Sequence, residues 1–265
     1  MRQKCMTSAA SVWLVLLTIL ATACASSLYG WQVRTSSTPM PPSFQPAMFE
    51  QHSVALFGAI TSPALRGNEG GLSYELENIL HKVSPNWNVI SPQKLAKLIN
   101  RQGLAGEYAK MRADYELSNI FDGCALRKIA TGLGVRYVFQ PQLAAFSQTM
   151  TDRAKVIGFD FRVAQTRSSN MRVSLQLWDA ETGEMVWASM AETTMQNEAV
   201  SQDPVYMEDV ARATLGSIVT DFKNRKTAST YTPVNKFVND LIEEAVPHEK
   251  PEQQGVSEPA KKTVE

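Results

Sequence analysis

The chain has 265 residues, with 26 basic and 26 acidic side chains, so its formal charge at pH 7 is zero. A balanced charge argues against the clustered positive surface that nucleic-acid-binding proteins need. The length suffices for one sizeable domain with tails, or for two small domains.

Residues 1–24 begin with positive charge and continue with an apolar stretch. Arg2 and Lys4 supply the charge, and residues 9–21 supply the apolar stretch. A run of about 13 apolar residues is too short to span a bilayer, which indicates a cleaved signal. The small residues before Cys24 resemble the lipobox of bacterial lipoproteins, in which this cysteine receives diacylglycerol and becomes the new N-terminus. Ordinary secretion with cleavage nearby and an uncleaved helical anchor are the alternatives.

The resemblance to a lipobox implies a signal peptide over residues 1–23 and a covalent lipid on Cys24, with no other cofactor. Ala25 rather than Asp follows the cysteine, which is typical of lipoproteins sent to the outer membrane, so we expect a lipid anchor at its periplasmic face. Cys124 would then be the remaining thiol, and no internal disulfide is expected. We predict that Cys124 is a small buried residue.

Two tails flank the predicted domain. Residues 24–48 are rich in Ser, Thr and Pro and predict a tether that spans roughly 25–30 Å. Residues 247–265 contain almost no large apolar side chain and are predicted to be disordered. Between them we expect an α/β domain over residues 49–224 and a C-terminal helix region over residues 225–246.

The first half of this domain alternates strands and helices. A short buried strand is predicted at 54–59, an amphipathic helix over 70–83 and a second strand at 88–90. Ser91 and Pro92 predict the cap and first turn of the next helix, which Gly103 ends. A further helix carries Tyr108, Met111 and Tyr115, and Asp122 caps another that Gly134 ends.

The second half favours antiparallel strands. After a strand at 135–139, residues 156–164 and 171–178 alternate apolar with polar, which is typical of strands half covered by helices. A turn at 179–184 leads to a returning strand over 185–195. Two helices follow, one capped by Asp203 and Pro204 and one by Thr232 and Pro233. The order β-α-β-α-α-α-β-β-β-β-α-α predicts an α/β fold: one domain with a mixed parallel and antiparallel sheet and packed helices.

No pattern of residues predicts a catalytic or metal site. His52, His81 and His248 stand far apart and lack metal-ligand spacing, so we expect solvated surface histidines. No phosphate-binding loop and no nucleophile elbow occurs. We therefore expect no catalytic residues, no metal ligands and no enzyme activity.

Four segments resemble the α/β module of bacterial envelope lipoproteins, which is shared by the TolB amino-terminal domain, LpoB and CsgG. They are residues 54–59, 88–92, 129–138 and 177–187. The resemblance covers residues 53–224 and implies a TolB-like or CsgG-like fold. It also implies a non-enzymatic adaptor that binds unidentified envelope proteins and that can form a homo-oligomer. The alternatives are a subunit of a CsgG-like secretion or transport complex, and an envelope enzyme of unidentified class.

A CsgG-like subunit would need two long hairpins of about 9–11 residues per strand. Residues 156–164 and 171–178 nearly qualify as one hairpin. The other location, residues 102–125, is predicted to be helical. The adaptor is therefore the favoured reading.

The turn after Asp179 predicts a partner-binding surface. If Asp179 pairs with Glu184, then Trp178 faces Met185 and Trp187 lies diagonally from Trp178 on the same side of the sheet. Exposed aromatic pairs beside methionine are favoured anchors for partners, so Trp178, Trp187 and Met185 are the candidate binding residues. The alternative is that a helix, such as residues 233–245, covers this side and makes both tryptophans part of the core.

Overall fold

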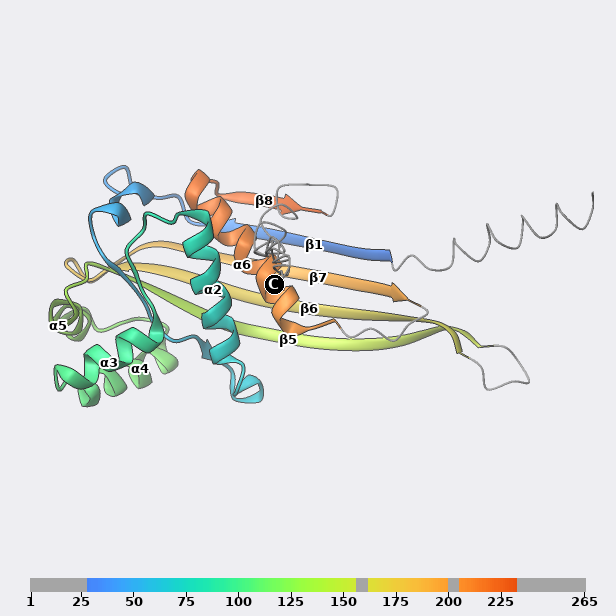
Figure 1. Ribbon diagram of the computed structural model, residues 1–265, viewed down its shortest axis with the longest axis horizontal. Coiled ribbons are helices and arrows are strands. Elements are labelled where there is room, and N and C mark those ends of the chain that lie inside the picture. The colour runs from blue at the N-terminus through green and yellow to red at the C-terminus, as the bar shows by residue number, and fades with distance from the viewer. Residues whose placement is uncertain (1–27, 156–161, 200–204, 233–265) are drawn as a thin grey trace, which may run out of the picture.

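The computed structural model describes residues 28–155, 162–199 and 205–232 (Figure 1). Eight strands form one sheet in the order β4-β2-β5-β6-β7-β1-β8, with β3 beside β5. The strands are β1 (Leu28–Ser37), β2 (Val54–Leu56), β3 (Ile60–Thr61), β4 (Val89–Ile90), β5 (Tyr137–Lys155), β6 (Arg162–Asp179), β7 (Glu184–Ala199) and β8 (Ala228–Tyr231). The helices are η1 (Pro46–Glu50), η2 (Pro63–Leu65), α2 (Glu69–Val83), α3 (Pro92–Arg101), α4 (Ala105–Ser118), α5 (Gly123–Leu133) and α6 (Met207–Asn224).

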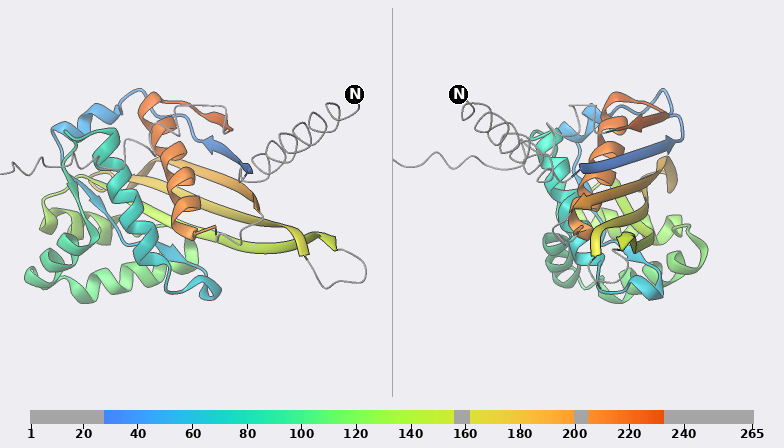
Figure 2. Two further views of the ribbon diagram at one scale, coloured as in Figure 1. Left: turned by 45° about the vertical axis from the view of Figure 1, so that its right-hand side comes forward. Right: turned by 90° about the vertical axis from the view of Figure 1, so that its right-hand side faces the viewer.

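The helices form two layers, one on each face of the sheet. Helices α2 and α6 cover one face, and α3, α4 and α5 cover the other face near one end (Figures 1 and 2). Strands β2, β4 and the start of β5 run parallel, whereas β5, β6, β7, β1 and β8 pair antiparallel. The predicted fold class is therefore confirmed: a single α/β domain with a mixed sheet and packed helices.

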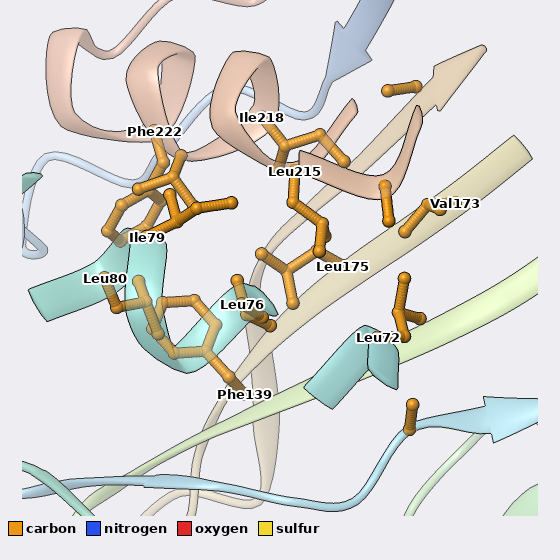
Figure 3. Packing of buried hydrophobic residues seen from close by; sticks show 14 of the residues in the cluster. Leu72, Leu76, Ile79, Leu80, Phe139, Val173, Leu175, Leu215, Ile218 and Phe222 are labelled. Carbon is orange, nitrogen blue, oxygen red and sulfur yellow. The ribbon is translucent and has the colours of Figure 1, made fainter. Parts of the chain in front are cut away.

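The larger core lies between the sheet and the pair α2 and α6. Side chains from both helices meet those of the central strands (Figure 3), among them Leu72, Leu76, Leu80, Phe139, Val173, Leu175, Leu215, Ile218 and Phe222. Burial of each such side chain contributes roughly 1.5–3 kcal/mol. Glu75 of α2 and Arg212 of α6 join the helices at the edge of this core, with 3.0 Å between Oε1 and Nη2.

The smaller core lies under α3, α4 and α5. It contains Val138 and Trp178 from the sheet, against Leu95, Met111 and Leu126 from the helices. Phe121 packs edge-on against Trp178 with ring centroids 5.3 Å apart. Because Val138 and Phe139 are neighbours on opposite faces of β5, the two cores share the same strands.

The predicted ends of the middle helices are confirmed. The hydroxyl of Ser91 accepts from the backbone N–H of Lys94, and the carboxylate of Asp122 accepts from that of Ala125 at 2.9 Å. Gly134 ends α5 with φ +68°, a conformation that glycine adopts without strain. The region 102–125, expected to be helical, contains α4.

The tether predicted over residues 24–48 is wrong for its described part. Residues 28–37 form β1, which lies between β7 and β8 inside the sheet. Val33 and Thr35 are buried and Arg34 and Ser36 are exposed, so the segment does alternate as a strand. The Ser- and Thr-rich composition hid this period, because threonine fits a strand as well as a loop.

The antiparallel strands of the second half of the domain are longer and fewer than predicted. Strand β5 continues to Lys155 instead of ending at 139, and β6 joins residues 162–179 in one element. The region 225–246, predicted to be helical, contains the strand β8. The helix expected after Pro233 lies outside the described residues, as do Asp203 and Pro204, and the N-cap of α6 is Tyr206.

Cys124 is exposed, so its predicted burial is wrong. It occupies the second position of α5, whose buried stripe consists of Leu126, Ile129, Ala130 and Leu133. Its spacing of two residues from Leu126 places it on another side of the helix, because neighbours on one face recur every three or four residues.

Candidate functional site

The predicted tryptophan pair does not form an exposed surface. Trp178 does face Met185, but the next pair is Leu177 with Trp187, because a bulge leaves Val186 without a partner. One extra residue turns every following side chain to the other face. Trp187 therefore lies in the larger core and Trp178 in the smaller one.

Both tryptophans are core residues on opposite faces of the sheet. Trp187 is 1 % exposed and packs against Phe222 of α6 with ring centroids 4.8 Å apart, and Trp178 is 5 % exposed. Trp187 is thus covered by α6. Residues 233–245, the helix suggested for this role, lie outside the described residues. Met185 alone of the three is exposed, at 45 %.

Two hollows adjoin at the end of the sheet where β6 turns into β7, and both are lined by Arg136. The first has a volume of about 530 Å³ and the second about 490 Å³. The first is also lined by His52, Arg127, Ala130, Thr131, Val135, Ala180 and Glu181. The second is also lined by Thr38, Pro39, Pro41, Ser43, Phe44, Tyr137, Asp179, Thr182, Glu184, Met185 and Val186. We call the two hollows together the Arg136 site.

Local structure places Arg136 between the hollows. Gly134 ends α5, Val135 is buried, and Arg136 follows immediately before β5 begins. The carbonyl of Arg136 accepts a hydrogen bond of 2.8 Å from the backbone N–H of Ala180. The start of β5 and the β6–β7 turn are thereby held side by side.

The turn itself is docked on the first residue of α5. Gly183 has φ +78°, and a Cβ added there would lie 3.0 Å from the Cα of Gly123. Only glycine fits both the conformation and the contact. Asp179 closes the turn by accepting from the backbone N–H of Glu181 at 2.9 Å.

Arg136 is paired with two acidic residues of the site. The guanidinium of Arg136 lies 3.0 Å from Asp179 Oδ2 and 3.2 Å from Glu181 Oε2, and it stacks over the ring of Tyr137. The hydrogen bond to Asp179, aided by the nearby carboxylates, raises the pKa of Arg136 above its usual value. Arg127 donates from Nε to the carbonyl of Glu181 at 3.0 Å. The site therefore offers directed hydrogen-bond donors with little net charge.

Among the described residues, the pKa values that differ from the ordinary value of the group are all shifted further from pH 7. A hydrogen bond from Thr61 is the largest cause that lowers the pKa of Glu69. Burial raises the pKa of the tyrosines, including Tyr137 in the site. Acid–base catalysts instead have pKa values tuned toward the working pH. The arrangement suits binding better than proton transfer.

His52 was expected to be a solvated surface residue, but it is half-buried and lines the first hollow. Its ring packs edge-on against Tyr137, with centroids 6.3 Å apart. Analysis of the sequence missed Arg136 and Asp179 as well. The pairing of Tyr137 with Asp179 across β5 and β6 brings them together. Arg136 and Asp179 are 43 residues apart in the chain, so no local sequence signal indicates their contact.

Neither a metal-binding cluster nor a membrane-spanning helix occurs among the described residues. There, no group of three or more His, Cys, Asp and Glu side chains is placed to hold a metal ion. No helix in the described part of the chain is long and apolar enough to cross a membrane. Cys24 lies outside the described residues.

Comparison with known proteins gives distant structural similarities. No family model matches the sequence. No curated protein matches it either. The PelC dodecamer from Paraburkholderia phytofirmans is 14 % identical and covers 72 % of this chain and 97 % of its own, with a TM-score of 0.41.

Two further solved structures are similar at the same distance. The LpoB C-terminal domain from Salmonella enterica is 15 % identical, covering 57 % of this chain and 85 % of its own, with a TM-score of 0.34. Lipoprotein GNA1162 from Neisseria meningitidis is 11 % identical, covering 66 % and 96 %, with a TM-score of 0.33.

Proposed function

We propose that this chain is a lipid-anchored protein of the bacterial envelope that binds a partner protein at the Arg136 site and acts as a non-enzymatic adaptor. The anchor is the lipid on Cys24, at the periplasmic face of the outer membrane. The observation that carries the binding role is the pair of hollows that share Arg136. They are concave, they combine apolar walls with a few directed polar groups, and they lie beside an exposed turn.

The chemistry of the site favours a peptide segment as the ligand. Proline and aromatic side chains from Pro39, Pro41 and Phe44 form one wall of the second hollow, and Met185 lies at its border. Methionine adapts its shape to a partner, and the guanidinium of Arg136 donates to carbonyl or carboxylate oxygens. These groups together suit an extended segment with apolar and polar side chains.

Met185 gives a direct test, because it lines the site and is already exposed. Met185→Asp places a charge beside Asp179 and Glu184, and it should abolish capture of the partner while the melting temperature stays near that of the wild type. The measurement is photo-crosslinking in cells from an amino-acid analogue at Thr182, followed by quantification of the crosslinked species. Mass spectrometry of the purified protein should find the lipid on Cys24.

Met190 provides the matched control. It lies on β7 like Met185, it is 50 % exposed, and it lines neither hollow. Met190→Asp should leave the crosslinked species unchanged. Equal loss in both variants, or retention in both, would contradict a partner site at Arg136.

A further inference from the structure

The four longest strands end together, far from the Arg136 site. Leu28 at the start of β1 pairs with Glu198 of β7, Glu198 lies opposite Thr166 of β6, and Thr166 lies opposite Thr151 of β5. We call this region the distal end, defined as residues 28–32, 151–155, 162–167 and 194–199. Figures 1 and 2 show the strands extending beyond the helices here.

The distal end and the Arg136 site lie at opposite ends of β7. Met185 borders the site, and Glu198 belongs to the distal end. Met185 and Glu198 are thirteen residue steps apart on β7, and an extended strand of that length spans about 40 Å. The helices α3, α4 and α5 all pack at the Arg136 end.

The length of chain before β1 restricts where a lipid on Cys24 can reach. Four residue steps separate Cys24 from Leu28, and even a fully extended chain of that length spans at most about 14 Å. This limit holds for any conformation of residues 24–27. A bilayer that holds the lipid therefore lies near the distal end and far from the Arg136 site.

The charge of the distal end complements an anionic lipid surface. The distal end contains four basic residues, Arg153, Lys155, Arg162 and Arg167, against two acidic residues, Asp152 and Glu198. Lys155 and Arg162 are cross-strand partners and form the last pair of β5 and β6 before residues 156–161. Like charges opposite one another destabilise an isolated sheet, and anionic headgroups would relieve that cost.

We propose that the distal end rests on the bilayer surface, with its basic strand ends against anionic headgroups, and that the molecule stands on these strands with the Arg136 site directed away from the membrane. The proposal rests on the lipidation of Cys24 proposed above. It adds an orientation and a second contact with the membrane, through headgroups rather than through the acyl chains.

Fluorescence quenching in vesicles tests this orientation with the full mature protein. One probe is attached to the native thiol of Cys124, beside the Arg136 end, and one to Met150→Cys in a Cys124→Ser background, where residue 150 is 53 % exposed beside the distal end. The vesicles contain phosphatidylethanolamine, phosphatidylglycerol and a lipid with a nitroxide on its headgroup. We expect strong quenching at position 150 and little at position 124.

Charge variants test the headgroup contact separately. Arg153→Gln with Lys155→Gln should weaken quenching at position 150, as should high salt or omission of phosphatidylglycerol. Lys94→Gln with Lys97→Gln, two exposed cations on α3, is the matched control and should leave it unchanged. Equal effects of both pairs would overturn the charge contact.

The remaining outcomes are also decisive. Equal quenching at positions 124 and 150 in a protein that carries its lipid would overturn the orientation and leave the proposed anchoring intact. Stronger quenching at position 150 by a nitroxide deep in the acyl chains would show insertion and overturn the surface contact. An unmodified Cys24 in mass spectrometry would refute the anchoring itself, and the orientation with it.

Discussion

At the scale of single residues, the carboxylate of Asp221 is a fully buried polar group outside the site. It lies on α6 and accepts hydrogen bonds from the hydroxyls of Thr35, Ser229 and Tyr231. These partners belong to β1 and β8, so one side chain ties the helix to two strands. Three hydroxyl donors satisfy a charge that would otherwise be costly to bury.

Asp221→Ala should therefore destabilise the protein strongly. The substitution leaves three hydroxyl groups near the core without their acceptor, and we expect a loss of about 3–5 kcal/mol in the free energy of unfolding. Urea denaturation followed by circular dichroism measures it. Asp209→Ala, at an exposed carboxylate of the same helix, should cost less than about 1 kcal/mol. Similar losses of unfolding free energy in the two variants would contradict a stabilising role for the hydrogen bonds of Asp221.

Tyr115 gives a prediction about alkaline pH. Burial raises its pKa from 10.0 to about 12, and its hydroxyl donates to Gln176 Oε1 at 2.8 Å. The folded protein thus holds this proton more tightly than the unfolded chain does. The resulting stability is present below pH 10 and is lost as the pH rises toward 12.

Tyr115→Phe should make stability less dependent on pH in this range. The variant loses one hydrogen bond, worth about 1 kcal/mol, at pH 8. Above pH 10 the gap to the wild type should narrow, because phenylalanine has no proton to lose. Urea midpoints between pH 8 and pH 11 give the comparison, and parallel curves for the two proteins would argue against a buried phenol at this position.

At the scale of elements, β1 changes what can be removed from the chain. It pairs along its ten residues with β7 and through residues 33–36 with β8. Its removal would leave β8 without a partner strand. It would also expose the unpaired edge of β7, and an exposed strand edge promotes aggregation. The segment that looks like a dispensable tether is a structural strand.

Two truncations should therefore behave differently. A chain that begins at residue 28 should stay soluble and unfold cooperatively, because every described strand is kept. A chain that begins at residue 48 should aggregate or fail to fold. Gel filtration and a thermal melt distinguish them, and a monomeric, cooperative protein from the shorter chain would show that β1 is not required.

At the scale of the whole molecule, two cores share one sheet. Neighbouring residues on β6, such as Leu177 and Trp178, belong to different cores. Unfolding of either helical layer would expose one face of the strands, and the other layer packs on the opposite face of the same strands. The arrangement favours a single cooperative unit over two independent ones.

Unfolding should consequently show one transition. Tryptophan fluorescence reports both cores, since Trp187 lies in the larger and Trp178 in the smaller, and far-UV circular dichroism reports all elements. The two signals should give the same midpoint in urea. A variant with Trp31, Trp87 and Trp187 replaced by Phe keeps Trp178 of the smaller core as its tryptophan among the described residues, and it should keep that agreement. Separate midpoints would show that the helical layers unfold independently.

Most of the local structure could be predicted from the sequence alone. Ser91 with Pro92 and Asp122 with Gly134 delimit their helices, because a cap acts within one turn of the backbone. The alternation over 171–178 identified a half-buried strand, and the sequence of parallel and antiparallel segments determined the fold class. These signals need no knowledge of what the segment packs against.

Only the tertiary structure decided the positions that depend on pairing. The bulge at Val186 separated Trp178 from Trp187, the partners β7 and β8 turned residues 28–37 into a strand, and the pairing of β5 with β6 brought Arg136 to Asp179. Each of these outcomes depends on residues distant in the chain, and a shift of one position reverses the face of a side chain. The sequence alone therefore determined the middle helices and their ends, whereas long-range pairing decided that residues 28–37 and 228–231 form strands and which residues share a surface.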